Sequence, residues 1–414
     1  MDKDNTKSTF TEYLMPLNYE FMLAQIKHLN LDKYVKKLDC ITTTKLFIFA
    51  QLLQIKSYTD IHLKLNETEK LQQLLRLESI SISQLSRKFR DMDESLLEAV
   101  FKDLVQQVSR RLGVPKTNQK LGRIHLIDSS TISLCLMKYR WAEFRKTKAG
   151  IKIHQRIIYC EDGVYPDEAI LTPAKPADKT QMDALVVTDS DALNIFDRGY
   201  IDYRKFDIYC RNNIRFVTRL KSNAIIDVIQ EHTAKPSSNI LREATVLLGD
   251  KKTYLMESPL RLIECLDGEG NLVRILTNDF KLDSDEISEL YRIRWQIELF
   301  FKWMKQHLHI KRCYGTSRTA VYNQIRIALI TFCLTILIQL NVSYKGSLLT
   351  VFKHVNLAWD TTFELFIEAL FREPTRSSQG RRKMNHERIF AETLQQYEKG
   401  NVDHLNDMTY DPII

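Results

Sequence analysis

The chain has 414 residues, which is more than one compact core holds, so we expect roughly two to four domains. With only 12 glycines, the composition favours a helix-rich protein over a turn-rich all-β one. The formal net charge of +8 fits a polyanionic partner, and it fits a basic protein without a nucleic-acid partner equally well.

Cysteines and apolar segments narrow the class of protein further. The seven cysteines are scattered and none form a CxxC pair, so we expect neither a disulfide framework nor a zinc site. The first ten residues lack the apolar stretch of a secretory signal. The longest apolar run, 327–340, has about 14 residues, fewer than the roughly 20 that span a bilayer, and predicts a buried core helix. These features predict a cytoplasmic protein without a membrane partner.

Residues 1–120 form the first predicted unit, a helical N-terminal domain. Apolar residues recur there at three- and four-residue steps, as in 45–53 and 96–105. Between these stretches, 81–90 predicts a short helix capped by Ser81 and carrying three basic residues. This helix either enters a DNA groove in helix-turn-helix manner or is a solvated helix of an all-α domain. The sequence leaves both interpretations open.

The pattern changes at residue 121, where strands begin. Apolar runs at 123–128, 151–159, 168–173, 192–197 and 215–220 predict five strands, and 180–194 predicts a helix. We therefore expect an α/β fold whose mixed sheet is flanked by helices, with 121–221 as the first part of a catalytic core.

Three further segments complete the predicted organisation. Short alternating runs over 222–280 predict a β-rich insertion. Residues 281–345 are expected to complete the core with a helix from Ser284 to about His309, capped by Ser284-Asp285-Glu286, and a second helix over about 320–341. The last segment, 346–414, is a predicted helical and basic tail. Its stretch 372–383 has five Lys or Arg residues, which would add salt-dependent DNA affinity.

One face of the helix predicted over 284–309 carries an unusual set of polar residues. At 100° per residue, the side chains of this set fall within an arc of roughly 60°, beside an apolar stripe; they are Tyr291, Arg294, Glu298 and Lys305. A glutamate between cations can bind a metal while its neighbours hold phosphates. The alternative is a surface helix in which Arg294 and Glu298 form an ordinary i,i+4 ion pair.

Two aspartates end predicted strands, Asp128 at the first and Asp197 at the fourth. The carboxyl ends of strands are where catalytic groups of α/β sheets collect, although Asp197-Arg198-Gly199 is also a common turn sequence. Together with Glu298 they make an oxygen-ligand set suited to Mg²⁺, with Mn²⁺ as a substitute. Such a site would activate an attacking water or 3′-hydroxyl for phosphoryl transfer.

These motifs resemble a known family. Tyr291-x₂-Arg294-x₃-Glu298-x₆-Lys305 is similar to the tyrosine–arginine–glutamate–lysine signature of bacterial DDE transposases of the insertion-sequence 4 family. Four more segments resemble this family in the right order: 127–130 and 197–200 its first and second aspartate motifs, 149–154 its second strand, and 177–179 a segment beyond the third. The resemblance covers roughly residues 121 to 345.

The resemblance implies an RNase H-like core with catalytic, metal-binding carboxylates at Asp128, Asp197 and Glu298. It implies DNA contacts from Tyr291, Arg294 and Lys305. The expected activity is cut-and-paste transposition on double-stranded DNA, at transposon ends and target, by a homodimer in the bacterial cytoplasm that associates with the nucleoid when bound to DNA. The alternatives are an RNase H-like nuclease without strand transfer and a derived, non-catalytic DNA-binding protein.

Two further pairs of residues have open roles. Lys152 and His154 alternate on one predicted strand and either point at DNA or the catalytic pocket, or divide into one solvated and one packed side chain. Trp295 and Trp303 could stack on an unpaired base, but tryptophans at such positions are more often core or interface residues, which is our prediction for both.

Overall fold

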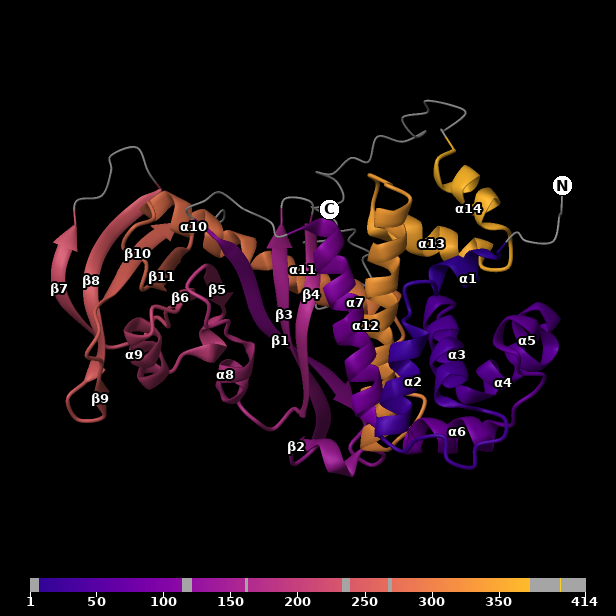
Figure 1. Ribbon diagram of the computed structural model, residues 1–414. Helices are drawn as coiled ribbons and strands as arrows, with labels where there is room; N and C mark the ends of the chain where they lie inside the picture. The colour runs from indigo at the N-terminus through magenta and orange to yellow at the C-terminus, as the bar shows by residue number, and fades with distance from the viewer. Residues whose placement is uncertain are drawn as a thin grey trace.

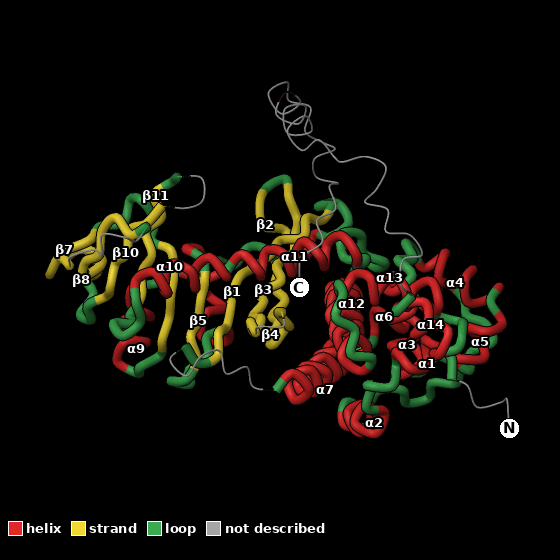
Figure 2. The backbone as a smooth tube through the Cα atoms, turned by 90° about the horizontal axis from the view of Figure 1, so that it is seen from above, coloured by secondary structure: helices red, strands yellow, loops and turns green. Residues whose placement is uncertain are grey.

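The computed structural model describes residues 7–113, 121–160, 163–232, 239–266 and 270–372, together with Gln395. Figure 1 shows an elongated molecule with a twisted β-sheet at one end and a body of helices at the other. Two helices, α10 and α11, run across the sheet toward the helical body, as the view from above in Figure 2 shows.

The helical body uses residues from both ends of the chain. Its first seven helices are α1 (Thr9–Tyr13), α2 (Tyr19–His28), α3 (Cys40–Leu52), α4 (Tyr58–Glu67), α5 (Glu69–Leu75), α6 (Ile82–Asp91) and α7 (Glu94–Leu112). Its last three are α12 (Arg318–Asn341), α13 (Leu348–Ala358) and α14 (Phe363–Leu370). The helix predicted over 81–90 is confirmed as α6, and Ser81 and Gln84 form a capping box at its start.

The centre of this body is α12, which packs against α3, α6, α7 and α13. The core helix predicted from the apolar run 327–340 is therefore confirmed. In the part of the chain that the structure describes, α12 alone has the length and apolarity to cross a membrane, and its apolar stretch is entirely buried inside the protein. Its hydrophobicity is explained by packing on all sides.

The two ends of the described chain meet in this body. Ser8 forms a β-bridge with Thr362, and the backbone N–H of Phe10 donates to the carbonyl of Trp359. Inside, the hydroxyl of Tyr13 donates to the carbonyl of Thr331 on α12 at 2.7 Å. The first and last helices are thus parts of one packed unit.

The remaining elements belong to the sheet and to the helices on its faces. The strands are β1 (Arg123–Leu134), β2 (Glu143–Arg145), β3 (Lys148–Cys160), β4 (Gly163–Pro173), β5 (Ala192–Phe196), β6 (Arg215–Arg219), β7 (Ile226–His232), β8 (Ile240–Asp250), β9 (Tyr254–Leu255), β10 (Leu260–Leu266) and β11 (Leu272–Thr277). The helices are α8 (Met182–Leu185), α9 (Tyr203–Arg211), α10 (Ser284–Ile293) and α11 (Trp295–His307), with 3₁₀ turns η1 (Arg140–Ala142), η2 (Asp178–Gln181) and η3 (Arg198–Tyr200).

The central strands run in the order β4-β3-β1-β5-β6. β3 is antiparallel to β1 and β4, whereas β5 is parallel to both β1 and β6. Helices α7 and α12 pack on β4, and α11 packs on β1. The α/β, RNase H-like core predicted from the sequence, a mixed sheet flanked by helices, is confirmed.

The β-rich stretch beyond residue 222 continues this same sheet. β11 pairs antiparallel with β6, and the order then runs β11-β10-β8-β7. Arg215 of β6 is tied to this half by an ion pair of 2.9 Å with Asp279, just after β11. These strands therefore extend the central sheet laterally.

Two sequence-based helix predictions need correction. The helix expected over 284–309 is two helices, because hydrogen bonds of the i→i+3 type replace the regular ladder around Arg294, and its cap is Asp283 with Glu286. The helix expected over 180–194 is one 3₁₀ turn followed by the single turn α8. The backbone of Val187, beyond α8, is instead held by the buried side chain of Asn194 on β5, at 2.8 and 3.0 Å.

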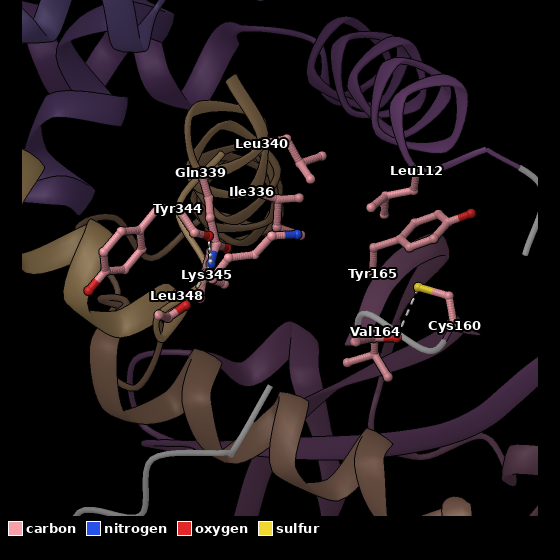
Figure 3. Close-up of a pocket in the computed structure, with 12 residues that line it drawn as sticks. Leu112, Cys160, Val164, Tyr165, Ile336, Gln339, Leu340, Tyr344, Lys345 and Leu348 are labelled. Carbon is pink, nitrogen blue, oxygen red and sulfur yellow. Dashed lines mark hydrogen bonds between the residues drawn. The ribbon is translucent and has the colours of Figure 1, made fainter. Parts of the chain in front are cut away.

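A cavity of about 270 Å³ lies between the helical body and the β3–β4 hairpin (Figure 3). Leu112 of α7, Tyr165 of β4 and Ile336 of α12 line it, and the thiol of Cys160 donates to the carbonyl of Gly163 at 3.1 Å. Its lining is mainly apolar and includes none of Asp128, Asp197 and Glu298.

Candidate active site

Asp128 and Asp197 are brought together by strand register. β1 and β5 are parallel neighbours in which Ile127 is the partner of Phe196, so Asp128 is the next residue on β1 and Asp197 directly follows β5. Both apolar partners are fully buried, which fixes the register because a one-residue slip would turn them out of the core. The two carboxylates therefore leave the sheet side by side.

Glu298 approaches the same edge from α11. A pocket of about 420 Å³ is lined by both Asp128 and Glu298, together with cationic and hydroxyl side chains. Arg294 joins these two acids: its guanidinium donates to Asp128 at 3.3 Å and to Glu298 at 2.6 Å. Only 14% of the Arg294 side chain is exposed, so this double contact is largely shielded from water.

The buried carboxylate of Asp128 has few hydrogen-bond donors and little positive charge around it. Its carboxylate accepts the backbone N–H of Ser129 at 2.7 Å and the long contact from Arg294. Burial raises its pKa to about 7; Asp197 and Glu298 push the pKa in the same direction, against the lowering effects of Ser129 and Arg294. A carboxyl group held in this way gains from a cation.

The other residues of the predicted signature lie around these acids. Tyr291 packs beneath Arg294, whose guanidinium lies 5.7 Å from the ring centroid, and burial raises the pKa of Tyr291 to about 12. Lys305 lines the pocket and its ammonium group lies 3.4 Å from the carbonyl of Thr131 on β1. Despite the helix break at Arg294, the residues predicted to share a face thus surround one site.

Comparison with known proteins agrees with this geometry. Residues 119–334, more than half of the chain, match the family model described as a transposase DDE domain. The chain belongs to this family. It is 32% identical over 266 residues to a protein of Sinorhizobium fredii named as transposase y4zB, covering 63% of this chain and 74% of that one.

Two further relatives are named as transposases of insertion sequences. One, for IS5377 of Geobacillus stearothermophilus, is 27% identical over 59% of this chain and 62% of its own length. The other, for IS4SA of Synechocystis, is 23% identical over 62% of this chain and 72% of its own. A solved piggyBac transposase synaptic complex with hairpin DNA aligns with a TM-score of 0.45 at 13% identity, over 90% of this chain and 84% of that one. The predicted identity, a DDE transposase of the insertion-sequence 4 kind, is confirmed.

Sequence reasoning missed one acidic residue beside this transposase site. Asp178 of η2 accepts hydrogen bonds from Ser129 and from Lys152, each at 2.8 Å. A Cβ atom at Gly199 would lie 3.4 Å from Oδ2 of Asp178 and 4.0 Å from Oδ2 of Asp197, which puts these two carboxylates on the same side of η3. The segment 177–179 resembled the transposase family, but nothing in its spacing assigned a role to Asp178.

The open question about Lys152 and His154 is answered by Asp178. Both side chains lie on the same face of β3 and turn toward this carboxylate, Lys152 at 2.8 Å and His154 at 3.7 Å. His154 is fully buried, and burial lowers its pKa to about 4, so it is neutral near pH 7. Neither residue is the solvated partner that one interpretation of the sequence expected.

The two tryptophans of α11 differ. Trp303 is buried and packs edge-on against Phe332 of α12 with ring centroids 4.8 Å apart, which confirms its predicted core role. Trp295 is 55% exposed and is therefore no core residue, which leaves the interface role of the prediction for it. It directly follows Arg294, at the helix break, where its ring faces solvent.

The donor set fits a hard divalent cation in chemistry. Three carboxylates without histidine or cysteine suit Mg²⁺ or Mn²⁺, and the burial of Asp128 leaves it short of positive charge. Among the described residues, no group of three Asp, Glu, His or Cys side chains lies close enough together to hold a metal ion. The guanidinium of Arg294 bridges Asp128 and Glu298 in this arrangement.

Proposed function

We propose that this transposase moves an insertion sequence by a cut-and-paste reaction, with metal-dependent strand cleavage and strand transfer at terminal inverted repeats. Two observations support the proposal: the pairing of Ile127 with Phe196 puts Asp128 beside Asp197, and Arg294 joins Asp128 to Glu298. We assign the catalytic and metal-binding roles to these three carboxylates, with Mg²⁺ as the cation and Mn²⁺ as a substitute.

The chain's own residues each have a defined task in this proposal. A bound divalent cation would activate the attacking water or 3′-hydroxyl and neutralise charge on the leaving oxygen. Arg294, released from its acidic partners, is positioned to hold a phosphate oxygen in two-point fashion. Tyr291 fixes Arg294 from beneath, and Lys305 provides a second cation at the pocket wall. These three residues are the proposed DNA contacts.

Other assignments extend the same proposal. We assign DNA binding to the helical N-terminal domain, residues 1–120, and a supporting electrostatic role to the basic tail; residues 373–383 of that tail lie outside the described part of the chain. The active form is proposed to be a homodimer, because two transposon ends must be held together. Its partners are the transposon ends and target DNA, and nucleoid association follows from DNA binding.

The decisive experiment uses the full chain with duplexes that carry its element's terminal inverted repeats. Asp128→Ala, Asp197→Ala and Glu298→Ala should each reduce Mg²⁺-dependent cleavage by about 10³-fold or more, because each removes a metal ligand, while end binding persists. Full activity in any one variant rejects that residue's assignment. As a control, Asp183→Ala removes an exposed acid that pairs with Lys205 and should leave cleavage unchanged.

A second assay separates the alternative activities. With pre-cleaved ends and a target plasmid, strand transfer supports the transposase mechanism, whereas cleavage without joining supports an RNase H-like nuclease. If calorimetry detects no Mn²⁺ binding by the wild-type chain while the chain still binds DNA, the result supports a non-catalytic DNA-binding protein.

A further inference from the structure

A row of cations leads away from the catalytic pocket toward the helical body. A second hollow, of about 300 Å³, adjoins the catalytic pocket and shares Lys305, Gln306 and Lys311 with it. Its far side is lined by Lys56 and Arg312, with His309 between. We call the surface formed by Lys56, Lys311 and Arg312 the basic groove; it joins the catalytic pocket at Lys305.

The basic groove is built on a rigid junction between the two halves of the molecule. Lys56 follows α3, whereas Lys311 and Arg312 lie in the loop between α11 and α12. Gln51 of α3 bonds that loop twice, from its amide nitrogen to the carbonyl of His309 and from its amide oxygen to the N–H of His309. Gln324 of α12 donates to the carbonyl of Arg312 at 2.8 Å. The loop backbone that carries Lys311 and Arg312 is therefore fixed against α3 and α12 before any ligand binds.

The charges of the groove have no acidic partners among the described residues. No Asp or Glu lines the second hollow, and none of the three groove cations makes an ion pair within the described ranges. Burial lowers the pKa of Lys305, and Lys311 lowers it further. Burial likewise lowers the pKa of His309, and the charge of Arg312 acts in the same direction, against a backbone hydrogen bond at Lys56 that raises it. Like charges held together in this way are stabilised by a polyanion.

We propose that the basic groove binds successive backbone phosphates of the DNA strand whose reacting phosphate lies at Asp128 and Glu298. This inference rests on the proposed function, since it extends from the same pocket. Lysine and arginine contacts to phosphates position a strand without reading its sequence. Because Lys56 comes from the helical body, a DNA strand bound in the groove is held in a fixed position relative to both that body and the proposed catalytic carboxylates.

The test compares two triple variants of the full chain. Lys56→Gln/Lys311→Gln/Arg312→Gln neutralises the groove, and Lys251→Gln/Lys252→Gln with Lys70→Gln removes three exposed cations elsewhere. Binding is measured between 50 and 200 mM salt to a duplex with the terminal repeat and to one of random sequence. Each lost phosphate contact lowers the salt slope by about 0.9, so the groove variant should lose about 40-fold less affinity than wild type over this range.

Both duplexes should show the same change, because the contacts are to the backbone. An unchanged salt slope, or an effect confined to the terminal-repeat duplex, overturns the inference, as does an equal effect in the control variant. Thermal unfolding of each variant and of the single substitutions shows whether a loss is due to misfolding. If wild type binds DNA through the groove but cleaves no end, the inference stands and the proposed function fails. If the groove variant cleaves ends and binds DNA as wild type does, the proposed function stands and the inference about the groove fails.

Discussion

Two regions of the molecule bury carboxylates in opposite ways. At the β6–β11 side, Asp207 of helix α9 is fully buried and accepts hydrogen bonds from the Tyr254 hydroxyl at 2.6 Å and from the backbone N–H of Ser258 at 2.8 Å. Burial alone would raise its pKa, but these bonds hold the pKa below its ordinary value. At the β1–β5 edge, Asp128 has one backbone donor and a shared arginine, and its pKa rises to about 7.

The comparison separates carboxylates that serve the fold from Asp128, for which we propose a catalytic role. Asp279 repeats the first arrangement, with the N–H groups of Lys281 and Leu282 and the guanidinium of Arg215 as donors. Asp207 and Asp279 are thus both compensated by donors of the protein itself. At the β1–β5 edge the compensation is incomplete, and a cation and a phosphate can complete it.

The largest effect on stability is expected from Asp207→Ala. This change leaves the partly buried Tyr254 hydroxyl and two backbone N–H groups without their acceptor, which should lower the free energy of unfolding by about 3 kcal/mol. Urea denaturation measures it. At a temperature where the variant is folded, end cleavage should be unimpaired; a catalytic defect there would contradict the purely structural role assigned to this side of the sheet.

In contrast to Asp207→Ala, Asp128→Asn should raise the free energy of unfolding when divalent ions are absent. Because the folded pKa of Asp128 lies above its unfolded value, the native state binds more protons between about pH 4 and 7, so its contribution to stability falls as pH rises through this window. The asparagine variant avoids this cost and should be more stable than wild type by about 2 to 3 kcal/mol at pH 8, with little difference at pH 4. Denaturation at both pH values in chelator is the measurement, and a destabilised variant at pH 8 would disprove the uncompensated burial.

A smaller effect should follow from Asp178→Asn. This residue touches Ser129 and Lys152 but is assigned no metal, so it acts as a positioning residue for the Asp128 strand. We expect cleavage to fall about 10- to 100-fold with end binding retained. Lys152→Met should give a similar loss, and the double variant should lose little more than either single one. Additive losses would show that the two side chains act separately.

The polar face that runs along α10 and α11 was predictable because four side chains at helical spacing define it by themselves. Despite the break at Arg294, Glu298 and Lys305 line one pocket, and Tyr291 packs under Arg294. Asp178 was not predictable as a site residue, because its role depends on how η2 packs onto β3, 26 residues away along the chain from Lys152 to Asp178.

Contacts between residues distant in the sequence also explain the helix wrongly predicted over 180–194 and the lateral extension of the sheet. Local apolar pattern favoured a helix through Val187, but the buried amide of Asn194 binds the backbone of this residue and directs the chain into β5. The strands beyond residue 222 were recognisable as strands. Their union with the core depends on the pairing of β11 with β6, a contact between segments about 60 residues apart that alternation in the sequence does not encode.

The meeting of the chain ends in the helical body has a consequence for synthesis. Helices α3, α6 and α7 pack on α12, so they have no complete core until residue 341 has left the ribosome. The strands β1 to β6 pair with one another much earlier, within 123–219. The portion translated first is therefore among the last to acquire its final packing, and a chain released before α12 would carry strands of the catalytic sheet beside N-terminal helices that lack their central partner.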